Sequence, residues 1–234
     1  MSGFTINPFS GFSSTLLTDL IAWWPMDETS GTRNDSHTNA LHLDDNLTVL
    51  YDTGKVSNAA NFARTNAEFL DRAASDSELN PSGDLTIAGW LKPATFLVTA
   101  SIFSKYATAG NQRGWHMHVG TDGSAAFIAS ADGTAASNCV WSANLVVDTW
   151  YHFLCYYDGT ANEIGIQVDN GTAVTTSFTG PINASTSPFH LGRLPATSNY
   201  YDGLMDEVAV WSRLLTSDEK ATIYNSGAGT GYPS

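Results

Sequence analysis

Five dipeptides that favour tight turns divide this chain into short segments. Asn-Gly and Asp-Gly tolerate the positive φ angles of hairpin turns, so we expect the strands on either side of each dipeptide to be antiparallel neighbours. The flanking segments are short and rich in β-branched and aromatic residues. Many short strands at this spacing predict an all-β sandwich or barrel. The dipeptides are Asp122-Gly123, Asp132-Gly133, Asp158-Gly159, Asn170-Gly171 and Asp202-Gly203.

One helix interrupts this pattern near the C-terminus. Thr216 followed by Glu219 three residues later forms a capping box, and Gly227 is expected to end the helix. We expect this helix to close one edge of the sandwich.

Residues 1–17 form an N-terminal arm in which aromatic and aliphatic residues are spaced among Gly, Ser, Asn and Pro. The arm is either a strand packed on its own domain, residues 18–234, or a segment docked on a neighbour.

The charge of the chain limits the kinds of partner. Lys and Arg number 10 against 23 Asp and Glu, giving a net charge of −13. This balance repels phosphate backbones, so nucleic acid is not expected as a partner.

No apolar run is long enough to suggest a membrane span, and no secretory signal is recognised, which predicts synthesis in the cytoplasm. Cys139 and Cys155 lie in apolar runs, where buried free thiols are expected and a disulfide is the alternative.

Six segments occur in the order typical of one family of modules, and together they carry a resemblance. They are "LIAWWPMDETSG", "LTIAGWLKP", "DTWYHFLCYYDGT", "IQVDNG", "FHLGR" and "YDGLMDEVAVWSRLLTSDEKATIYNSG". The chain resembles the laminin-G-like modules of the concanavalin A-like lectin/glucanase superfamily over residues ~17–232. That resemblance implies an antiparallel β-sandwich of the jelly-roll type with one short C-terminal helix.

Two adjacent carboxylates, Asp206 and Glu207, interrupt a segment that otherwise resembles a buried strand. The resemblance implies that this strand lies beside the N-terminal segment, which would bring the pair near Asp27, Glu28 and Asp35. Ca²⁺ coordinated by carboxylates and carbonyls would remove the repulsion among these charges, so a structural calcium ion is expected there. The alternative is that Asp206 caps backbone N–H groups or forms an ion pair with Arg213 or Arg33.

Catalysis is not expected from this sequence. Relatives in the superfamily include retaining glucanases, which need two carboxylates about 5–5.5 Å apart. A strand presents such groups on one face when they alternate, whereas Asp206 and Glu207 are adjacent and are expected to point to opposite faces. Neither a nucleophile elbow nor a phosphate-binding loop is present in the sequence.

Aromatic residues in expected loops are the candidates for ligand binding, because sugar-binding sites stack rings on pyranose faces. These candidates are Tyr106, Trp115, Tyr200 and Tyr201, and the alternative is that they pack beneath the loops.

Two functions of the protein are kept open. One is a virion-associated or surface-associated structural protein, such as a capsid decoration or fibre module, whose arm contacts other virion or surface proteins or makes a homo-oligomer. The other is a carbohydrate-binding module that recognises a surface glycan.

Overall fold

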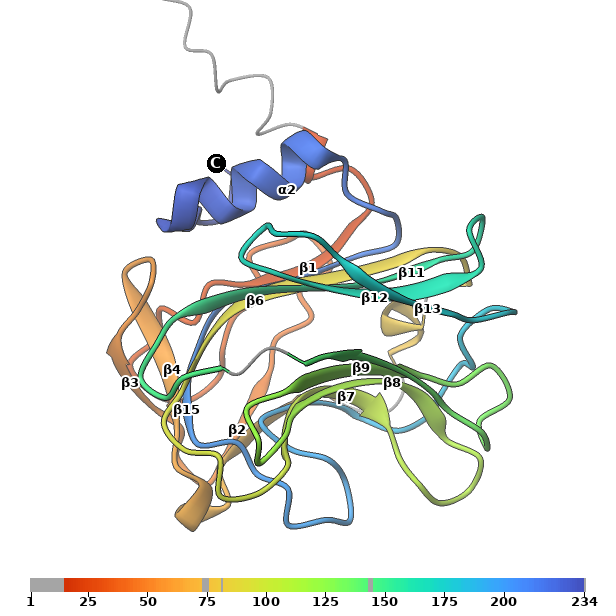
Figure 1. The fold of residues 1–234 in the computed structure, drawn as a ribbon. Helices are drawn as coiled ribbons and strands as arrows, with labels where there is room; N and C mark the ends of the chain where they lie inside the picture. Colours follow the sequence, from red (N-terminus) through yellow and green to blue (C-terminus); the bar gives the residue numbers. More distant parts are fainter. Residues whose placement is uncertain (1–14, 73–75, 81, 143–144, 234) are drawn as a thin grey trace, which may run out of the picture.

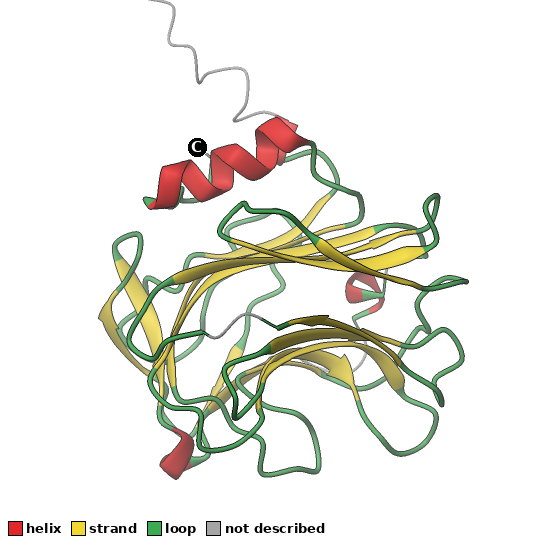
Figure 2. Cartoon of the chain, in the orientation of Figure 1, coloured by secondary structure: helices red, strands yellow, loops and turns green. Residues whose placement is uncertain are grey.

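The described part of the chain is a sandwich of two antiparallel sheets. The structure is a computed structural model, and it describes residues 15–72, 76–80, 82–142 and 145–233. The sheets lie face to face, and the loops gather at the rims (Figure 1). Figure 2 shows that strands dominate this arrangement and that helix is confined to short segments. The predicted all-β antiparallel sandwich with one short C-terminal helix is confirmed.

The two sheets differ in size and strand order. The larger sheet contains, in spatial order, β13 (Val174–Ser177), β12 (Glu163–Val168), β11 (Tyr151–Asp158), β6 (Leu85–Pro93), β15 (Gly203–Trp211), β4 (Asn58–Phe62) and β3 (Leu50–Thr53), and β1 (Leu20–Trp24) also pairs with β15. The smaller sheet contains β10 (Ser137–Trp141), β9 (Ala125–Ala129), β8 (Arg113–Val119), β7 (Ala100–Tyr106), β14 (Phe189–Leu191), β5 (Phe69–Arg72) and β2 (Asp44–Asn46).

The turn dipeptides give the predicted hairpins in four cases. They join β8 to β9, β9 to β10, β11 to β12 and β12 to β13, and each of these pairs is antiparallel. The prediction is wrong for Asp202-Gly203, because β14 lies in the smaller sheet and β15 in the larger one. Gly203 has a φ of +139°, and a Cβ there would lie 2.3 Å from the Lys92 carbonyl oxygen. This glycine permits a close approach between strands and is not part of a hairpin turn.

Strand β15 joins the beginning of the chain to its end. Its first half pairs with β4 and its second half with β1, while β6 pairs along its other edge. Every residue of β15 is buried. The predicted proximity of the N-terminal segment to the strand that carries Asp206 and Glu207 is therefore confirmed.

The C-terminal helix α2 (Ser217–Tyr224) covers the outer face of the larger sheet (Figure 1), so the expectation that it closes an edge is wrong. Ile223 packs there with Trp23 and Trp211, which point away from the sandwich interior. Leu16 is buried in the same cluster, so residues 15–17 belong to the domain, whereas residues 1–14 of the predicted arm lie outside the described residues. The predicted capping box of Thr216 and Glu219 is confirmed.

Short 3-10 turns and the two cysteines complete the described chain. The turns span Arg64–Asn66, Ser77–Leu79 and Asn225–Gly227, and the last extends the end of α2 to the predicted Gly227. Asn225, in the left-handed conformation, is the residue that caps the helix. Cys139 and Cys155 are buried free thiols, as expected. None of the described helices is long and apolar enough to cross a membrane.

An aromatic group holds the end of α2 to the larger sheet. The Tyr224 ring stacks on Trp90 with centroids 5.8 Å apart, and His152 lies 5.1 Å from Trp90 and 6.0 Å from Tyr224. Burial lowers the pKa of His152 to about 3. This imidazole is therefore neutral in the folded protein near neutral pH.

We predict that His152→Phe makes the free energy of unfolding less sensitive to acid. Below the ordinary pKa of 6.5, the unfolded chain binds a proton at His152 that the folded chain excludes. This difference removes stability as the pH falls through that window, at about 1.4 kcal/mol per pH unit for one proton. Urea unfolding of both proteins at several pH values below 6.5 should show a slope smaller by about one proton in the variant. Equal slopes would contradict the prediction.

Candidate functional site

A backbone irregularity places Asp206 and Glu207 on the same side of the larger sheet. The register between β15 and β6 shifts between Asp206 and Ala209, and Glu207 has a φ of +49°. Trp90, the register partner of Asp206, shares a small cavity with Glu207 beneath the C-terminal segment. The expectation that the two carboxylates point to opposite faces is therefore wrong, because a bulge breaks the alternation.

Asp206 holds the turn between β3 and β4. Its Oδ2 accepts hydrogen bonds from the backbone N–H groups of Lys55 at 2.7 Å and Val56 at 2.8 Å. A Cβ at Gly54 would lie 2.6 Å from this oxygen and 2.4 Å from the Asn58 carbonyl, so the turn can approach only with glycine at that position. The alternative that Asp206 caps backbone N–H groups is confirmed. Its other oxygen, Oδ1, is buried without a hydrogen-bond partner.

Glu207 links β15 to β1 through a side chain. Its Oε2 accepts a hydrogen bond from Trp23 Nε1. Burial raises the pKa of Glu207 to about 8 and that of Asp206 to about 7, and the negative charge of Asp27 raises both. Protonation of Asp206 or Glu207 is therefore one way to remove negative charge from this pair of buried carboxyl groups.

The other three predicted acidic residues have separate partners. Asp35 accepts backbone hydrogen bonds from Trp23, His37 and Leu41, each at 2.9 Å, through both of its oxygens. Asp27 Oδ1 accepts from the backbone of Asn58 at 3.0 Å. Glu28 Oε1 accepts from the backbone and side chain of Asn34, and its Oε2 is buried without a partner.

These contacts bear on the expected calcium ion. Within the described ranges, no three His, Cys, Asp or Glu side chains are grouped so that they could hold a metal. The oxygens of Asp35 are occupied by backbone donors, whereas Asp206 Oδ1 and Glu28 Oε2 are buried carboxylate oxygens without a partner. Calcium binding here stays a prediction, and the positions of the described side chains give it no added support.

Three of the four predicted ligand-binding aromatics are buried. Trp115 lies in β8 inside the core and donates to the Leu79 carbonyl at 3.2 Å, and the Tyr201 hydroxyl donates to the Leu204 carbonyl at 3.1 Å. Tyr106 lies in β7 with its ring 5.6 Å from His116. The expectation that Tyr106 and Trp115 lie in loops is therefore wrong. Tyr200 is half-buried in the loop between β14 and β15.

The structure places Tyr200 beside a group of residues that sequence reasoning missed. We call this group the aromatic–polar face; it lies on the outer side of β2, β5 and β14 and consists of Asn46, Phe69, Asp71, His190, Arg193 and Tyr200. Asn46 pairs with Phe69, and Asp71 pairs with His190, so members of each pair point to the same side. The smaller sheet is arched, with its concave side turned away from the larger sheet (Figure 1).

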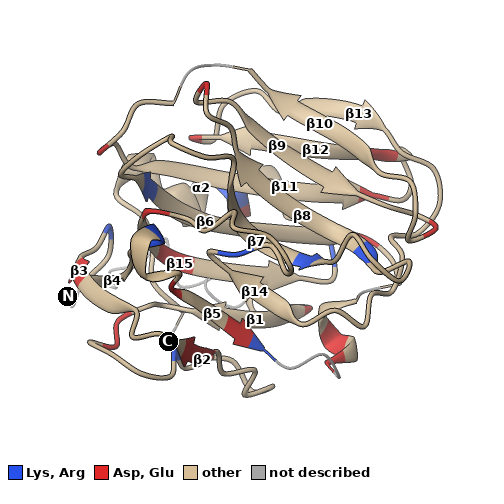
Figure 3. Ribbon diagram, turned by 90° about the horizontal axis from the view of Figure 1, so that it is seen from below, with Lys and Arg blue, Asp and Glu red and all other residues tan. Residues whose placement is uncertain are grey.

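Aromatic and cationic groups form the centre of this face. Phe69 lies 5.7 Å from the His190 ring and 6.4 Å from the Tyr200 ring. The Arg193 guanidinium lies over Phe69 at 4.4 Å and near Tyr200 at 5.9 Å. Figure 3, seen from the side of the smaller sheet, shows acidic residues on β2 and β5, with the basic Arg72 at the end of β5. The signal in the sequence was the alternation of Phe69 and Asp71 with core-facing Leu70 in one short strand.

Hydrogen-bonding groups surround that centre. The His190 Nδ1 lies 3.1 Å from the Pro188 carbonyl, which can only accept, so Nδ1 carries the proton and Nε2 is left as an acceptor. Burial lowers the pKa of His190 to about 4, so the ring is neutral at pH 7. Asp71 accepts from Asn46 Nδ2 at 2.6 Å, and burial raises its pKa. Neutral and charged acceptors next to rings are the groups that bind sugar hydroxyls and pyranose faces.

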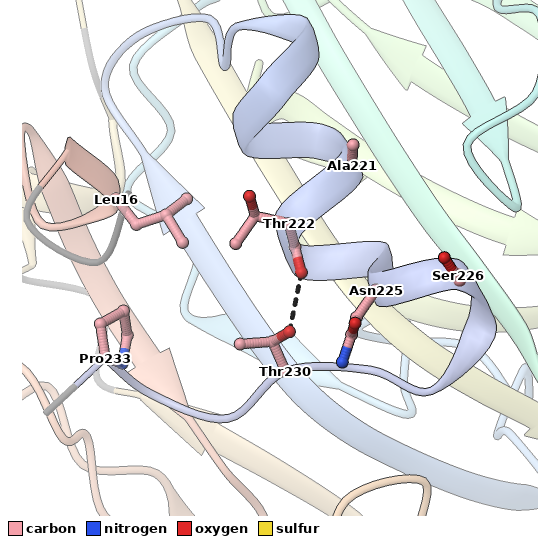
Figure 4. A pocket seen from close by; sticks show the side chains of 7 residues that line it. All are labelled: Leu16, Ala221, Thr222, Asn225, Ser226, Thr230 and Pro233. Atoms are coloured by element: carbon pink, nitrogen blue, oxygen red, sulfur yellow. Dashed lines mark hydrogen bonds between the residues drawn. The ribbon is translucent and has the colours of Figure 1, made fainter. Parts of the chain in front are cut away.

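A cavity of about 550 Å³ lies beside α2 (Figure 4). The Thr230 hydroxyl donates to the Thr222 carbonyl at 2.7 Å across one side of this cavity. The described residues of its lining include no charged or aromatic side chain; they are Leu16, Ala221, Thr222, Asn225, Ser226, Thr230 and Pro233. It therefore offers fewer groups for recognising a polar ligand than the aromatic–polar face does.

Comparison with known proteins identifies the architecture. A laminin-G family model, described as the concanavalin A-like lectin/glucanases superfamily, matches residues 71–219. No curated protein matches the sequence. The fold is similar to domain 4 of AbnA, a GH43 extracellular arabinanase from Geobacillus stearothermophilus solved with arabinotriose, with a TM-score of 0.67 and 16% identity over 91% of this chain and 98% of that one.

Toxin binding domains share the fold as well. The binding domain of Paraclostridial Mosquitocidal Protein 1 has a TM-score of 0.74 and 14% identity over 91% of this chain and 53% of that chain. The binding domain of Botulinum Neurotoxin DC in complex with SialylT has a TM-score of 0.65 and 10% identity over 90% of this chain and 51% of that one. The chain thus spans about half the length of these toxin domains. At such identities the similarity shows the fold alone.

We predict that Asp206→Ala lowers the free energy of unfolding by about 2–3 kcal/mol, because it leaves the N–H groups of Lys55 and Val56 without their acceptor. Asp206→Asn is the matched control. It keeps an acceptor and resembles the protonated carboxyl, so its change should stay within about 1 kcal/mol. Urea unfolding at pH 7 measures both. Equal losses in the two variants would contradict the role assigned to Asp206.

The calcium prediction has its own test. A bound ion stabilises the folded state, so excess EDTA should lower the melting temperature by several degrees, and added calcium should restore it. Elemental analysis of the purified protein would accompany the thermal scan. An unchanged melting curve in EDTA together with no bound metal would contradict calcium binding.

Proposed function

We propose that this chain, which belongs to the concanavalin A-like lectin/glucanase superfamily, is a non-catalytic domain that binds a glycan through its aromatic–polar face. The observation that carries this proposal is the half-buried Tyr200 ring beside the buried rings of Phe69 and His190, with Asp71 next to them. Rings of this kind contact the apolar faces of sugars, and the acceptors orient the hydroxyls.

The solved structures support a binding function in general terms. The arabinanase domain was solved with arabinotriose, and a botulinum neurotoxin type C structure is described in terms of interaction with two ganglioside molecules. Sugar recognition thus occurs in proteins that contain this fold. Which sugar this chain binds does not follow from them, because fold does not determine function.

A catalytic role has less support from the geometry. The adjacent carboxylates Asp206 and Glu207 are buried beneath the C-terminal segment and bind Lys55, Val56 and Trp23. They are committed to the protein itself and are unavailable to flank a glycosidic bond. On the aromatic–polar face, Asp71 is bound by Asn46 Nδ2, and its register partner on β14 is His190, which is not a carboxylate. Asp44 pairs with Asp71 on the other side, at the exposed edge strand β2.

Virion decoration stays a prediction from the sequence resemblance, as does contact of the N-terminal arm with other virion or surface proteins. A virion module that displays the aromatic–polar face outward could also bind a glycan, so the two functions are compatible. The described start of the arm is part of the domain, because Leu16 accepts a hydrogen bond from Trp211 Nε1 at 2.8 Å. Homo-oligomer formation likewise stays a prediction.

We predict that Tyr200→Ala weakens glycan binding about tenfold or more, which corresponds to about 1.4 kcal/mol. The reason is the loss of the partly exposed ring that would contact the sugar, since Phe69 is buried beneath Arg193. Tyr51→Ala is the matched control, because Tyr51 is an exposed tyrosine in β3 of the larger sheet. A glycan array screened with the native protein, followed by titration of the best ligand, provides the measurement. Equal loss in both variants, or binding that Tyr200→Ala leaves unchanged, would contradict the proposed face.

A further inference from the structure

Arg193 has hydrogen-bonding capacity that the described protein does not use. Its side chain lies against Phe69 and Tyr200, and its Nε is buried without a hydrogen-bond partner. None of the guanidinium nitrogens of Arg193 donates a hydrogen bond to, or forms an ion pair with, any residue that the structure describes. A guanidinium carries five N–H donors, and leaving a buried donor unsatisfied costs stability.

Other arginines in the chain show how such groups are ordinarily satisfied. Arg213 makes hydrogen bonds to both carboxylate oxygens of Glu219 at 2.7 and 2.8 Å. Arg72 pairs with Asp76 at 2.5 Å, and Arg33 donates to backbone carbonyls. Arg64 likewise has no side-chain hydrogen bond to the described residues, and Arg193 differs from it because the Arg193 guanidinium lies over the ring of Phe69 while its donors stay free. This is the arrangement of a receptor for an oxyanion.

We infer that the sugar bound at the aromatic–polar face carries a single negative charge, as a carboxylate or a sulfate ester, and that the Arg193 guanidinium binds this group. The inference rests on the proposed glycan-binding function and specifies the class of its ligand. The fork of N–H donors in a guanidinium matches two oxygens of one oxyanion, which gives both energy and orientation.

Neighbouring charges restrict the ligand to one negative charge. Asp71 lies near Arg193, and exposed Asp44 is the register partner of Asp71 on the adjacent strand. A second charge on the ligand would meet these carboxylates, and the net charge of −13 would repel an extended polyanion. The neutral His190 ring and the Asp71 carboxylate remain as acceptors for hydroxyl groups on the same sugar.

The test compares acidic and neutral versions of one glycan on the native full-length protein. The probes are sialyllactose, sialyllactose methyl ester, lactose and 6-sulfated lactose, each titrated by calorimetry or ligand-observed NMR. We expect the charged sugars to bind about tenfold to hundredfold more tightly than the ester and lactose. The two charged probes distinguish carboxylate from sulfate as the preferred oxyanion.

Three variants assign the preference to Arg193. Arg193→Gln should remove the preference for charged sugars while weak binding of lactose persists, and Arg193→Lys should retain only part of it, because a lysine lacks the fork. Lys220→Gln is the matched control, since Lys220 also lies over a ring, Tyr156, at 5.3 Å but on the larger sheet. Circular dichroism and melting temperatures verify that each variant is folded. If Arg193→Gln fails to fold, Arg193→Lys provides the same comparison.

Two negative results have different meanings. Equal binding of charged and neutral sugars, unchanged in Arg193→Gln, would overturn the inference about Arg193 and leave the proposed glycan-binding function intact. No binding of any glycan on the array or in solution would overturn the proposed function itself, and the inference with it.

Discussion

The structure depends on how strand β15 accommodates two carboxylates within a fully buried strand. An ionised carboxylate is costly to bury unless hydrogen bonds, an opposite charge or a proton offsets the loss of water. Here the turn at Lys55 and Val56 binds Asp206, and the indole of Trp23 binds Glu207. The same contacts join the β3–β4 hairpin and the N-terminal strand β1 to the centre of the larger sheet. Two polar side chains thereby connect segments about 150 to 184 residues apart in the sequence.

This arrangement separates the structural part of the molecule from the part available for binding. The larger sheet is covered by α2 and the C-terminal segment, whose aromatic side chains pack on Trp23 and Trp90. No helix of the described ranges lies over the outer side of the smaller sheet in the same way (Figure 1). Half-buried Asn46, Asp71, Arg193 and Tyr200 are gathered there. Within the described residues, the two outer faces of the sandwich thus differ in what covers them.

Much of the fold follows from local sequence, and the site does not. Asp158-Gly159 and Asn170-Gly171 predict hairpins because their turn geometry depends on neighbouring residues alone. The bulge at Glu207 is different, because it depends on pairing with β6 across more than a hundred residues. The position of Arg193 depends on the register of β14 with β5 and on the loop that follows. The prediction puts Trp115 at the end of the expected loop "KYATAGNQRGW", whereas period-two alternation within "GWHMHV" directs its side chain into the core.

The most direct test of the account is to locate the bound glycan on the protein by NMR. Titration of isotope-labelled full-length protein with the best glycan from an array should shift backbone amide resonances of Phe69–Arg72, Phe189–Leu191 and Arg193 through Tyr200. Resonances around α2 should remain unchanged. Shifts confined to the cavity lined by Leu16, Thr222 and Thr230, with none on β5 or β14, would contradict the assignment of the aromatic–polar face as the binding site.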